Sequence, residues 1–253
     1  MIRVGVVGAA GRMGATVCDA VAAAEGLELA AAVDVVDGGG SVHGVGITKE
    51  LKSLVDARCD VVVDFTVASA ARQTLQFLAL HGIHAVVGTT GFSDDDLAAF
   101  GAAFTGSNCL IAANFAIGAV LMMKFAEQAA PYFETAEIIE FHHNAKADAP
   151  SGTAMATAQR MAAASSEWAA DPTKHEVIPG ARGGVGPGGI HVHGVRMVGM
   201  TASQEVILGT AGQTLVIRHD SNDRVSFMPG VVLACRKVAG LPARLTMGID
   251  SIL

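Results

Sequence analysis

Long apolar runs, clusters of basic residues and paired cysteines are all missing from this 253-residue sequence. The longest apolar stretch, residues 109–123, contains Asn114 and ends at Lys124, well short of the ~20 residues that a membrane-spanning helix needs. Glycines and Arg12 interrupt the apolar N-terminal segment, which favours a strand over a secretory signal. We therefore expect no contact with a membrane.

Charge and cysteine usage exclude further classes of partner. The sequence has 24 acidic and 17 basic residues, a formal net charge of -7 and no basic run, so nucleic acid is not an expected partner. Its four cysteines lie far apart without Cys-x-x-Cys spacing, which argues against a disulfide framework and a zinc site. We expect no bound metal and a reducing, cytoplasmic location.

The N-terminal half alternates short β-branched apolar segments with alanine-rich segments, which is typical of parallel strands joined by crossover helices. The expected strands are residues 2–7, 27–34, 61–65, 84–88 and 110–112, and the expected helices are residues 12–24, 68–81 and 94–105. This order predicts an α/β domain with a Rossmann-like, doubly wound parallel sheet.

After Gly118 the pattern changes. A helix to about residue 130 and another at 152–165 are expected, together with strands at 136–141, 190–197, 205–208 and 214–218. These elements predict an α+β domain with a mostly antiparallel or mixed sheet. Residues 180–189 contain six glycines, so we expect no regular element there. A mobile lid and a solvated connector are both open for this loop.

A glycine-spaced turn follows the first expected strand. Gly8, Gly11 and Gly14 have the spacing Gly-x-x-Gly-x-x-Gly, whereas the usual dinucleotide fingerprint is Gly-x-Gly-x-x-Gly, with Ala10 and Met13 at its last two positions here. A strand that runs through such a turn into a helix aims free amides at a pyrophosphate. A tight turn that binds nothing is the alternative interpretation.

Two charged residues bear on the choice of cofactor. Asp34 ends the second expected strand, where a carboxylate accepts hydrogen bonds from the adenosine ribose, which favours NADH. Arg12 lies inside the turn and offers a cation to a 2′-phosphate, so charge leaves NADPH open as well. A solvated strand end is the alternative for Asp34.

Two further strand ends carry small or polar residues: Gly88-Thr89-Thr90 and Ala112-Ala113-Asn114-Phe115. In a doubly wound sheet such carboxyl ends line the ligand crevice, where they would meet the nicotinamide ribose or carboxamide. Ordinary turn chemistry explains each segment, taken singly, equally well.

His142, His143 and Lys146 lie in a short irregular stretch after an apolar strand that ends with Glu140 and Phe141. A histidine near its ordinary pKa of ~6.5 exchanges protons at neutral pH, and a lysine supplies a cationic contact or a proton. These groups suit reduction beside a carbonyl or an imine. The alternative is a polar loop with a solvated lysine, in which Asp148 pairs with Lys146.

The helix expected after this stretch begins with Ser151, a good N-cap residue. Gly152 and Thr153 then supply first-turn amides at the positive end of the helix dipole. The capping-box position holds Ala154 rather than glutamate or glutamine, so no first-turn side chain competes for those amides. We expect room there for a substrate carboxylate.

The remaining histidines and arginines favour structural roles. His191 and His193 alternate along an expected strand, but no third ligand is evident, so a solvated or interface face is favoured over a metal site. Arg218, His219 and Arg224 flank residues 220–223, which we expect to form a hairpin or an interdomain contact.

With these segments in hand, the chain resembles the dihydrodipicolinate reductases of bacterial lysine and diaminopimelate synthesis. The resemblance spans nearly the whole chain and is most specific at residues 140–154, EFHHNAKADAPSGTA. It is supported by the segments GAAGRMG, VVDFT, VVGTTGF, ANFAIG and RHDSNDRVSFMPGV. Ala145 and Ser203 depart from the family pattern.

The resemblance implies NAD(P)H-dependent reduction of 4-hydroxy-tetrahydrodipicolinate, through dihydrodipicolinate, to tetrahydrodipicolinate. His142 would donate or accept a proton, Lys146 would donate one, and His143, Gly152 and Thr153 would bind the carboxylates of this small dicarboxylate substrate. The implied NADH or NADPH contacts are Gly8, Ala9, Ala10, Gly11, Arg12, Met13, Asp34, Gly88, Thr89, Thr90, Ala112, Ala113, Asn114 and Phe115.

The resemblance also implies the domain organisation. Residues 1–115 and 219–253 would form the dinucleotide-binding domain, with residues 231–238 returning as a helix that packs on the N-terminal half. Residues 116–218 would bind substrate and assemble a homotetramer.

Two rival functions remain. A dinucleotide-sensing regulator without catalysis would keep the fold, but the intact His-His-Lys segment argues against it. The other rival is a different two-domain NAD(P)H dehydrogenase that acts on an amino-acid-derived aldehyde or acid. Such a semialdehyde dehydrogenase needs a nucleophilic cysteine, and none of the four cysteines has a convincing catalytic setting.

Overall fold

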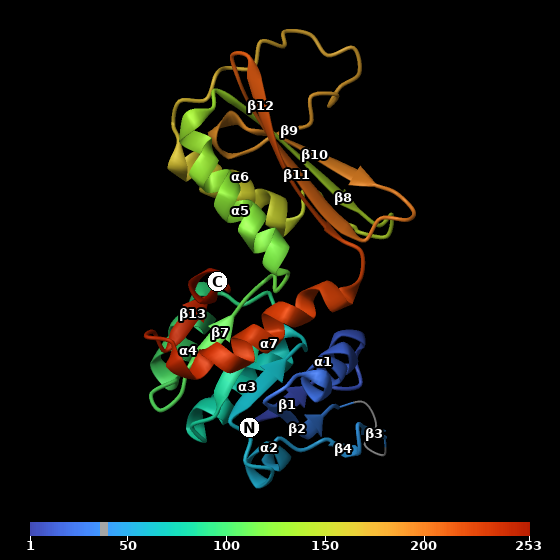
Figure 1. The fold of residues 1–253 in the computed structure, drawn as a ribbon, viewed down its shortest axis with the longest axis vertical. Coiled ribbons are helices and arrows are strands. Elements are labelled where there is room, and N and C mark those ends of the chain that lie inside the picture. Colours follow the sequence, from blue (N-terminus) through green and yellow to red (C-terminus); the bar gives the residue numbers. More distant parts are fainter. Residues whose placement is uncertain (36–39) are drawn as a thin grey trace. The chain divides into compact units, whose positions relative to one another are not determined.

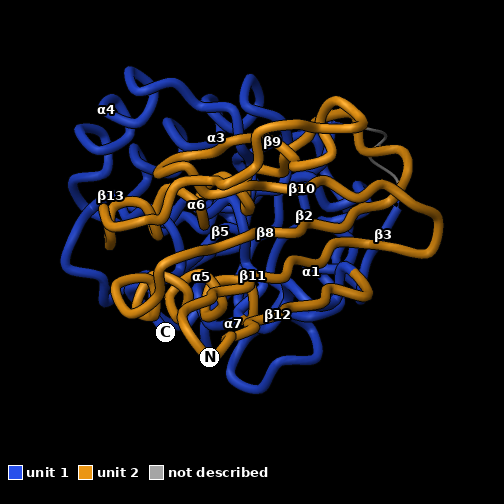
Figure 2. The backbone as a smooth tube through the Cα atoms, turned by 90° about the horizontal axis from the view of Figure 1, so that it is seen from above, with its two compact units in different colours: residues 1–117, 224–253 blue, residues 118–223 orange. Residues whose placement is uncertain are grey.

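The computed structural model describes residues 1–35 and 40–253. They divide into two compact units, Met1–Ile117 with Arg224–Leu253, and Gly118–Asp223, coloured separately in Figure 2. The expected boundaries, after residues 115 and 218, differ from these by two and five residues. The second difference arises because β12 (Gln213–Ser221) continues beyond its expected end at residue 218.

The first unit contains an eight-stranded sheet in the order β13-β7-β6-β5-β1-β2-β4-β3 (Figure 1). Every neighbouring pair is parallel except β3 and β4. Its strands are β1 (Ile2–Val7), β2 (Leu27–Val33), β3 (Ser41–Val42), β4 (Val45–Thr48), β5 (Val61–Asp64), β6 (His84–Val87), β7 (Cys109–Ile111) and β13 (Leu245–Met247). The central strands are valine-rich and buried, as parallel strands covered on both faces are. The predicted doubly wound α/β sheet is confirmed.

Helices cover both faces of this sheet. They are α1 (Arg12–Ala23), α2 (Lys52–Asp56), α3 (Ala68–Leu80), α4 (Asp94–Ala103) and α7 (Met228–Lys237). Leu54, Leu75 and Phe100, from α2, α3 and α4, join one buried cluster with Val7 and Val87 of the sheet. Helix α7 packs against α1 and β1, so the C-terminal segment does return to the N-terminal half as the resemblance implied.

The second unit contains a five-stranded sheet in the order β12-β11-β8-β10-β9. Its other strands are β8 (Thr135–His142), β9 (Gly184–Val185), β10 (His191–Arg196) and β11 (Ala202–Thr210). Strands β8 and β10 are parallel and the other pairs antiparallel, so the sheet is mixed, within the predicted class.

One face of this second sheet is covered by α5 (Ile117–Ala129) and α6 (Gly152–Ala164) (Figure 1). Ile138 and Glu140 of β8 are fully buried beneath these helices. Ile139 and Phe141 alternate with them on the opposite face and are partly exposed. The alternation places Glu140, a charged residue, among core positions.

Two local expectations were wrong, and three short elements were not predicted. Residues 180–189 do contain regular structure, namely β9 and a 3-10 turn at Pro187–Gly189, because β10 offers its edge to Gly184 and Val185. The turn expected at residues 220–223 begins later, since β12 includes Asp220 and Ser221. Short elements between β2 and β5, namely β3, β4 and α2, were not predicted. Within the described ranges, no helix combines the length and apolar character needed to cross a bilayer.

Candidate active site

The glycine turn after β1 is built by close backbone contacts. Gly8 has a φ of +84°, a conformation that L side chains rarely adopt, and the amides of Gly8 and Ala9 donate to the carbonyl of Val33 at 2.8 and 3.1 Å. A Cβ atom on Gly14 would lie 1.9 Å from the Gly8 carbonyl oxygen, so only glycine lets α1 start this close to the turn. The turn thus forms a backbone cradle at a helix start, which fits a dinucleotide pyrophosphate.

Asp34 follows β2 and is tied to this turn. Its Oδ2 accepts a hydrogen bond from the Ala10 amide at 2.8 Å, and its own amide donates to the Thr48 carbonyl at 2.9 Å. Strands β2 and β4 are parallel, with Val33 opposite Thr48. Lys49 directly follows Thr48, the residue whose carbonyl accepts the Asp34 amide. Lys49 is exposed and was not predicted from the sequence.

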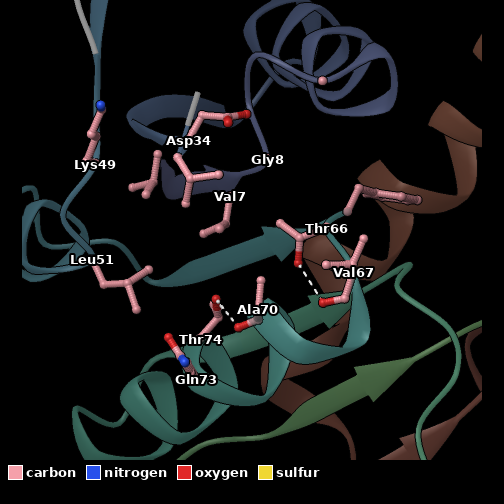
Figure 3. Close-up of a pocket in the computed structure, with 14 residues that line it drawn as sticks. Val7, Gly8, Asp34, Lys49, Leu51, Thr66, Val67, Ala70, Gln73 and Thr74 are labelled. Carbon is pink, nitrogen blue, oxygen red and sulfur yellow. Dashed lines mark hydrogen bonds between the residues drawn. The ribbon is translucent and has the colours of Figure 1, made fainter. Parts of the chain in front are cut away.

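A cavity of about 390 Å³ in the first unit brings Asp34 and Lys49 together with the glycine turn (Figure 3). Of the predicted cofactor residues, Gly8, Gly11 and Asp34 line it. The remaining lining residues are Val7, Val33, Val35, Lys49, Leu51, Phe65, Thr66, Val67, Ala70, Gln73 and Thr74. The pocket is mostly apolar with a few polar groups, as ligand sites usually are.

A buried carboxyl links this pocket to a second strand end. Asp64, the last residue of β5, accepts hydrogen bonds from the Thr66 and Thr89 hydroxyls at 2.7 and 2.9 Å. The Thr66 amide also donates to Thr89 Oγ1 at 2.9 Å. Burial raises the pKa of Asp64, although the hydrogen bonds from the two threonines oppose the shift. Thr89, a predicted cofactor residue, is therefore held beside Thr66 of the pocket.

The other predicted cofactor residues are divided between exposed and packed positions. Ala10, Arg12, Thr90 and Ala113 are exposed, whereas Ala9, Ala112 and Phe115 are buried; Met13, Gly88 and Asn114 are intermediate. The Phe115 ring lies 5.7 Å from that of Phe65, and a Cβ on Gly88 would meet the same Phe65 ring at 2.0 Å. The side chain of Phe115 is thus used for packing.

In the second unit, His142 is the last residue of β8 rather than a loop residue. Its Nδ1 lies 2.5 Å from Oε2 of Glu140, whose side chain is fully buried. Arg196, at the end of β10, donates to both oxygens of the same carboxylate, at 2.8 and 2.7 Å. Strands β8 and β10 are parallel, so Arg196 lies opposite His142 where the two strands end, although the residues are far apart in the sequence.

These contacts define the ionisation of Glu140. Burial opposes the charged form, but hydrogen bonds from Arg196 and His142 outweigh it and hold the pKa of Glu140 below its usual range. An ionised carboxylate only accepts hydrogen bonds, so the facing Nδ1 of His142 carries a proton. Nε2 of His142 is then the ring nitrogen left to exchange a proton with a ligand.

Lys146 lies in the loop after β8 and pairs with Asp148. Its Nζ lies 2.8 Å from Oδ1 of Asp148, and its amide donates to the His143 carbonyl at 3.1 Å. The hydrogen bond from Lys146 lowers the pKa of Asp148. Arg196 Nη2 also donates to the Asp148 carbonyl at 2.7 Å, which ties this loop to the Glu140 cluster. His143 is exposed.

Helix α6 begins as the sequence predicted. The Ser151 hydroxyl accepts a hydrogen bond from the Ala154 amide at 3.2 Å, and the Ser151 amide donates to Oε1 of Glu140 at 3.2 Å. Gly152 is exposed and Thr153 partly buried at the first turn. Glu140 therefore contacts both the histidine and the residue that caps this helix.

His191 and His193 form a separate cluster. His193 Nε2 lies 2.6 Å from Glu137 Oε2, and His191 Nε2 lies 3.3 Å from Asp171 Oδ2. His191 is buried, so of the two expected surroundings, a solvated or an interface face, the solvated one is wrong for this residue. Among the residues that the structure describes, no group of three or more histidine, cysteine or acidic side chains is arranged to hold a metal ion.

Both halves of the chain match known proteins. The profile of the dihydrodipicolinate reductase N-terminus matches residues 2–115, and that of its C-terminus matches residues 118–253. The chain belongs to the dihydrodipicolinate reductase family. A 4-hydroxy-tetrahydrodipicolinate reductase of Thermobifida fusca is 54% identical over 100% of this chain and 99% of its own length. One from Mycolicibacterium vanbaalenii is 50% identical with the same coverage.

Solved structures agree with this family assignment. Dihydrodipicolinate reductase from Paenisporosarcina sp. TG-14, determined with dipicolinate bound, superposes with a TM-score of 0.91 and 38% identity over 100% of both chains. Aspartate semialdehyde dehydrogenase II from Vibrio cholerae covers 94% of this chain and 98% of its own, with a TM-score of 0.55 and 12% identity, a likeness of fold alone.

The four cysteines argue against the alternative function, that of a semialdehyde dehydrogenase with a nucleophilic cysteine. All four are free and buried. Burial raises the pKa of Cys18 and of Cys235 to about 12, and that of Cys59 to about 11. A nucleophilic cysteine needs a thiolate at neutral pH, and burial disfavours that form at each of these positions.

Proposed function

We propose that this protein reduces 4-hydroxy-tetrahydrodipicolinate, through dihydrodipicolinate, to tetrahydrodipicolinate with NAD(P)H, in the diaminopimelate route of lysine synthesis. The full-length likeness to curated 4-hydroxy-tetrahydrodipicolinate reductases carries this proposal. The hydrogen-bonded Glu140–His142 pair and the nearby Lys146 supply the acid-base groups that the reaction requires.

His142 and Lys146 would handle the proton. NAD(P)H, when bound, supplies the hydride, and the carbon next to the reduced position then needs a proton. Nε2 of His142 faces away from the Glu140 carboxylate that holds Nδ1, so it is the ring nitrogen available for transfer. Lys146 is kept close by Asp148 and would act as the proton donor.

The start of helix α6 would bind a substrate carboxylate. Its first-turn amides have no acceptor within the helix, and the dipole places positive charge there. The Ser151 hydroxyl accepts from the Ala154 amide, and Gly152 and Thr153, exposed and partly buried at the first turn, would face the ligand. His143, exposed in the loop, would contact the same dicarboxylate.

The cofactor would bind along the glycine turn, and the pocket holds groups for both forms. Asp34 is placed to accept hydrogen bonds from ribose hydroxyls, as NADH recognition requires. Lys49, which directly follows β4, lines the same pocket and would pair with the 2′-phosphate of NADPH. We therefore propose that the protein uses both cofactors.

We further propose a homotetramer assembled through the second unit. The sheet face that α5 and α6 leave open carries Ile139, Phe141 and Val216, and Val216 is 52% exposed. Exposed apolar side chains on a sheet suit contact with another copy of the chain. Four buried free thiols fit a reducing location such as the cytoplasm.

Nicotinamide oxidation by the purified protein, with substrate generated enzymatically in the cuvette, tests the reaction. Separate runs with NADH and NADPH measure cofactor use, and a run without substrate measures background oxidation. We expect substrate-dependent oxidation and tetrahydrodipicolinate as product. Tight cofactor binding without turnover would instead support the regulator and refute the enzyme.

A further inference from the structure

Glu140 joins three parts of the candidate active site through one carboxylate. Its Oε2 faces His142 Nδ1 and Arg196 Nη1, and its Oε1 faces Arg196 Nη2 and the Ser151 amide. The side chain is fully buried, so water does not compete for these four hydrogen bonds. Hydrogen bonds to an ionised group in such surroundings are among the stronger ones in proteins.

We infer that Glu140 is a positioning residue for the reaction proposed above: it sets the tautomer of His142 and fixes this histidine relative to the helix that receives the substrate carboxylate. The inference rests on the proposed function for its catalytic meaning. A carboxylate on Nδ1 keeps the proton there and leaves Nε2 to exchange one with the substrate. The bond from Ser151 anchors the start of α6 to the same group.

Arg196 extends this arrangement to the lysine. Its guanidinium holds both oxygens of Glu140, and Nη2 also donates to the carbonyl of Asp148, whose carboxylate pairs with Lys146. Breaking the Glu140–Arg196 pair would therefore loosen the loop that carries the second proton donor. In this way one buried acid influences both proposed acid-base residues.

The neighbouring strand leaves room for the pair. Gly194 lies opposite Glu140 in the parallel register of β10 and β8. A Cβ at Gly194 would lie 3.1 Å from Oε1 of Glu140 and 3.7 Å from Nη1 of Arg196. A methyl group there presses on the carboxylate, so glycine preserves its hydrogen-bonding geometry.

Strand β8, which carries Glu140, also offers a matched control. Glu137 also pairs with one arginine and one histidine, through Arg182 Nη2 at 2.7 Å and His193 Nε2 at 2.6 Å. It lies on the opposite face of β8, and these two partners belong to residue 182 before β9 and to β10, not to the loop of Lys146 or the start of α6. Glu137→Gln therefore removes an equivalent ion-paired charge outside the proposed catalytic groups. Because Glu137 shares the open sheet face with Ile139 and Phe141, the particle mass of this variant is first compared with that of the parent protein.

The test compares Glu140→Gln with Glu137→Gln in the full-length protein. Glutamine keeps the shape of the side chain, but its amide presents a donor to His142 Nδ1, which drives the ring proton to Nε2. We expect kcat to fall roughly 100-fold in Glu140→Gln, the scale of lost acid-base catalysis. KM should rise as α6 loosens, while the affinity for NADH and NADPH should stay unchanged.

Two further readouts, a double variant and a nitrogen NMR spectrum, separate positioning from a general loss of structure. In a His142→Ala background, Glu140→Gln should lower kcat much less than in the parent protein, because the part of its effect that acts through His142 is already lost and only the part through the Lys146 loop remains.

Nitrogen NMR of histidine-labelled protein reads the tautomer without any turnover. We expect His142 to carry its proton on Nδ1 in the parent protein and on Nε2 in Glu140→Gln. If the parent protein fails to turn over substrate, the proposed function falls, and this spectrum still decides whether Glu140 sets the tautomer. An unchanged tautomer, or equal kcat losses in Glu140→Gln and Glu137→Gln, would overturn the inference.

Gly194→Ala provides the second variant should Glu140→Gln fail to fold. It retains the carboxylate and displaces it by a few tenths of an ångström, so we expect the same fall in kcat at smaller size, with unchanged cofactor affinity. Full activity in a folded Gly194→Ala protein whose Glu140 contacts are measurably displaced would count against positioning by Glu140.

Discussion

Glu137 and Glu140 lie three residues apart on β8, and each carboxylate binds one arginine and one histidine on opposite faces of the sheet. Their partners are Arg182 and His193 for Glu137, and Arg196 and His142 for Glu140. Only Glu140 is fully buried and contacts a helix start. The two carboxylates thus have the same kinds of partner, but only Glu140 lies next to the start of α6 and is placed for catalysis.

Removing either proposed proton-transfer group should abolish most of the activity. We expect His142→Ala and Lys146→Ala each to lower kcat at least ~100-fold, because each removes an acid-base group. Cofactor affinity should be retained, since the glycine turn belongs to the other compact unit. Steady-state kinetics and cofactor titration measure the two effects. His193→Ala, a histidine of the same sheet, is the control, and near-normal turnover in both test variants would refute the assignment.

Lys49 should contribute to NADPH binding and little to NADH binding. A lysine that pairs with the 2′-phosphate adds a contact that NADH cannot make. We expect Lys49→Ala to raise the Kd for NADPH about 10-fold, equivalent to about 1.4 kcal/mol, and to leave that for NADH nearly unchanged. Lys52→Ala removes an exposed lysine three residues away and serves as control. Equal losses for both cofactors would show that Lys49 does not read the phosphate.

The open sheet face can be tested by adding a charge. Val216 is 52% exposed on β12, opposite Ile207 of β11. If tetramers form across this face, Val216→Glu buries a carboxylate at the contact and should yield smaller particles in light scattering after gel filtration. Leu80→Glu, at an 81% exposed position in the first unit, should leave the particle mass unchanged. An unaltered mass in Val216→Glu would place any contact elsewhere.

Elements with a continuous apolar pattern were predictable from the sequence. β1 (Ile2–Val7) and α3 (Ala68–Leu80) were found within one residue of their observed ends, because buried parallel strands and amphipathic helices leave clear patterns. β3 (Ser41–Val42) and β4 (Val45–Thr48) are short and mixed in polarity, so no period marks them. Lys49 could not be predicted as a pocket residue for the same reason, because it lies at the pocket only through the pairing of β4 with β2.

The residues of the histidine segment were visible in the sequence, but their supporting contacts were not. Glu140 has the alternating position of a core residue in an apolar strand, which gave no sign of a charged partner. Its partner Arg196 lies 56 residues further along the chain, and only the parallel pairing of β8 with β10 brings the two together. Such contacts depend on register, which a single sequence does not define.

Asp64 should make the stability of the protein depend on pH with an unusual sign. Burial raises its pKa in the folded state, so the folded protein favours the neutral acid more than the unfolded chain does. The stability linked to this group is then fully present below its unfolded pKa of about 3.9 and is lost as pH rises through the folded pKa. Glu140, whose pKa is lowered, contributes in the opposite direction.

Comparison with Asp64→Asn isolates the effect, because the other carboxyls are common to both proteins. Asparagine keeps an acceptor for the hydroxyls of Thr66 and Thr89 and cannot ionise. We expect the free energy of unfolding of the parent protein, minus that of Asp64→Asn, to decrease as pH rises from about 4. Urea unfolding followed by circular dichroism at a series of pH values measures this difference. A difference that grows with pH would mean that the folded protein prefers ionised Asp64.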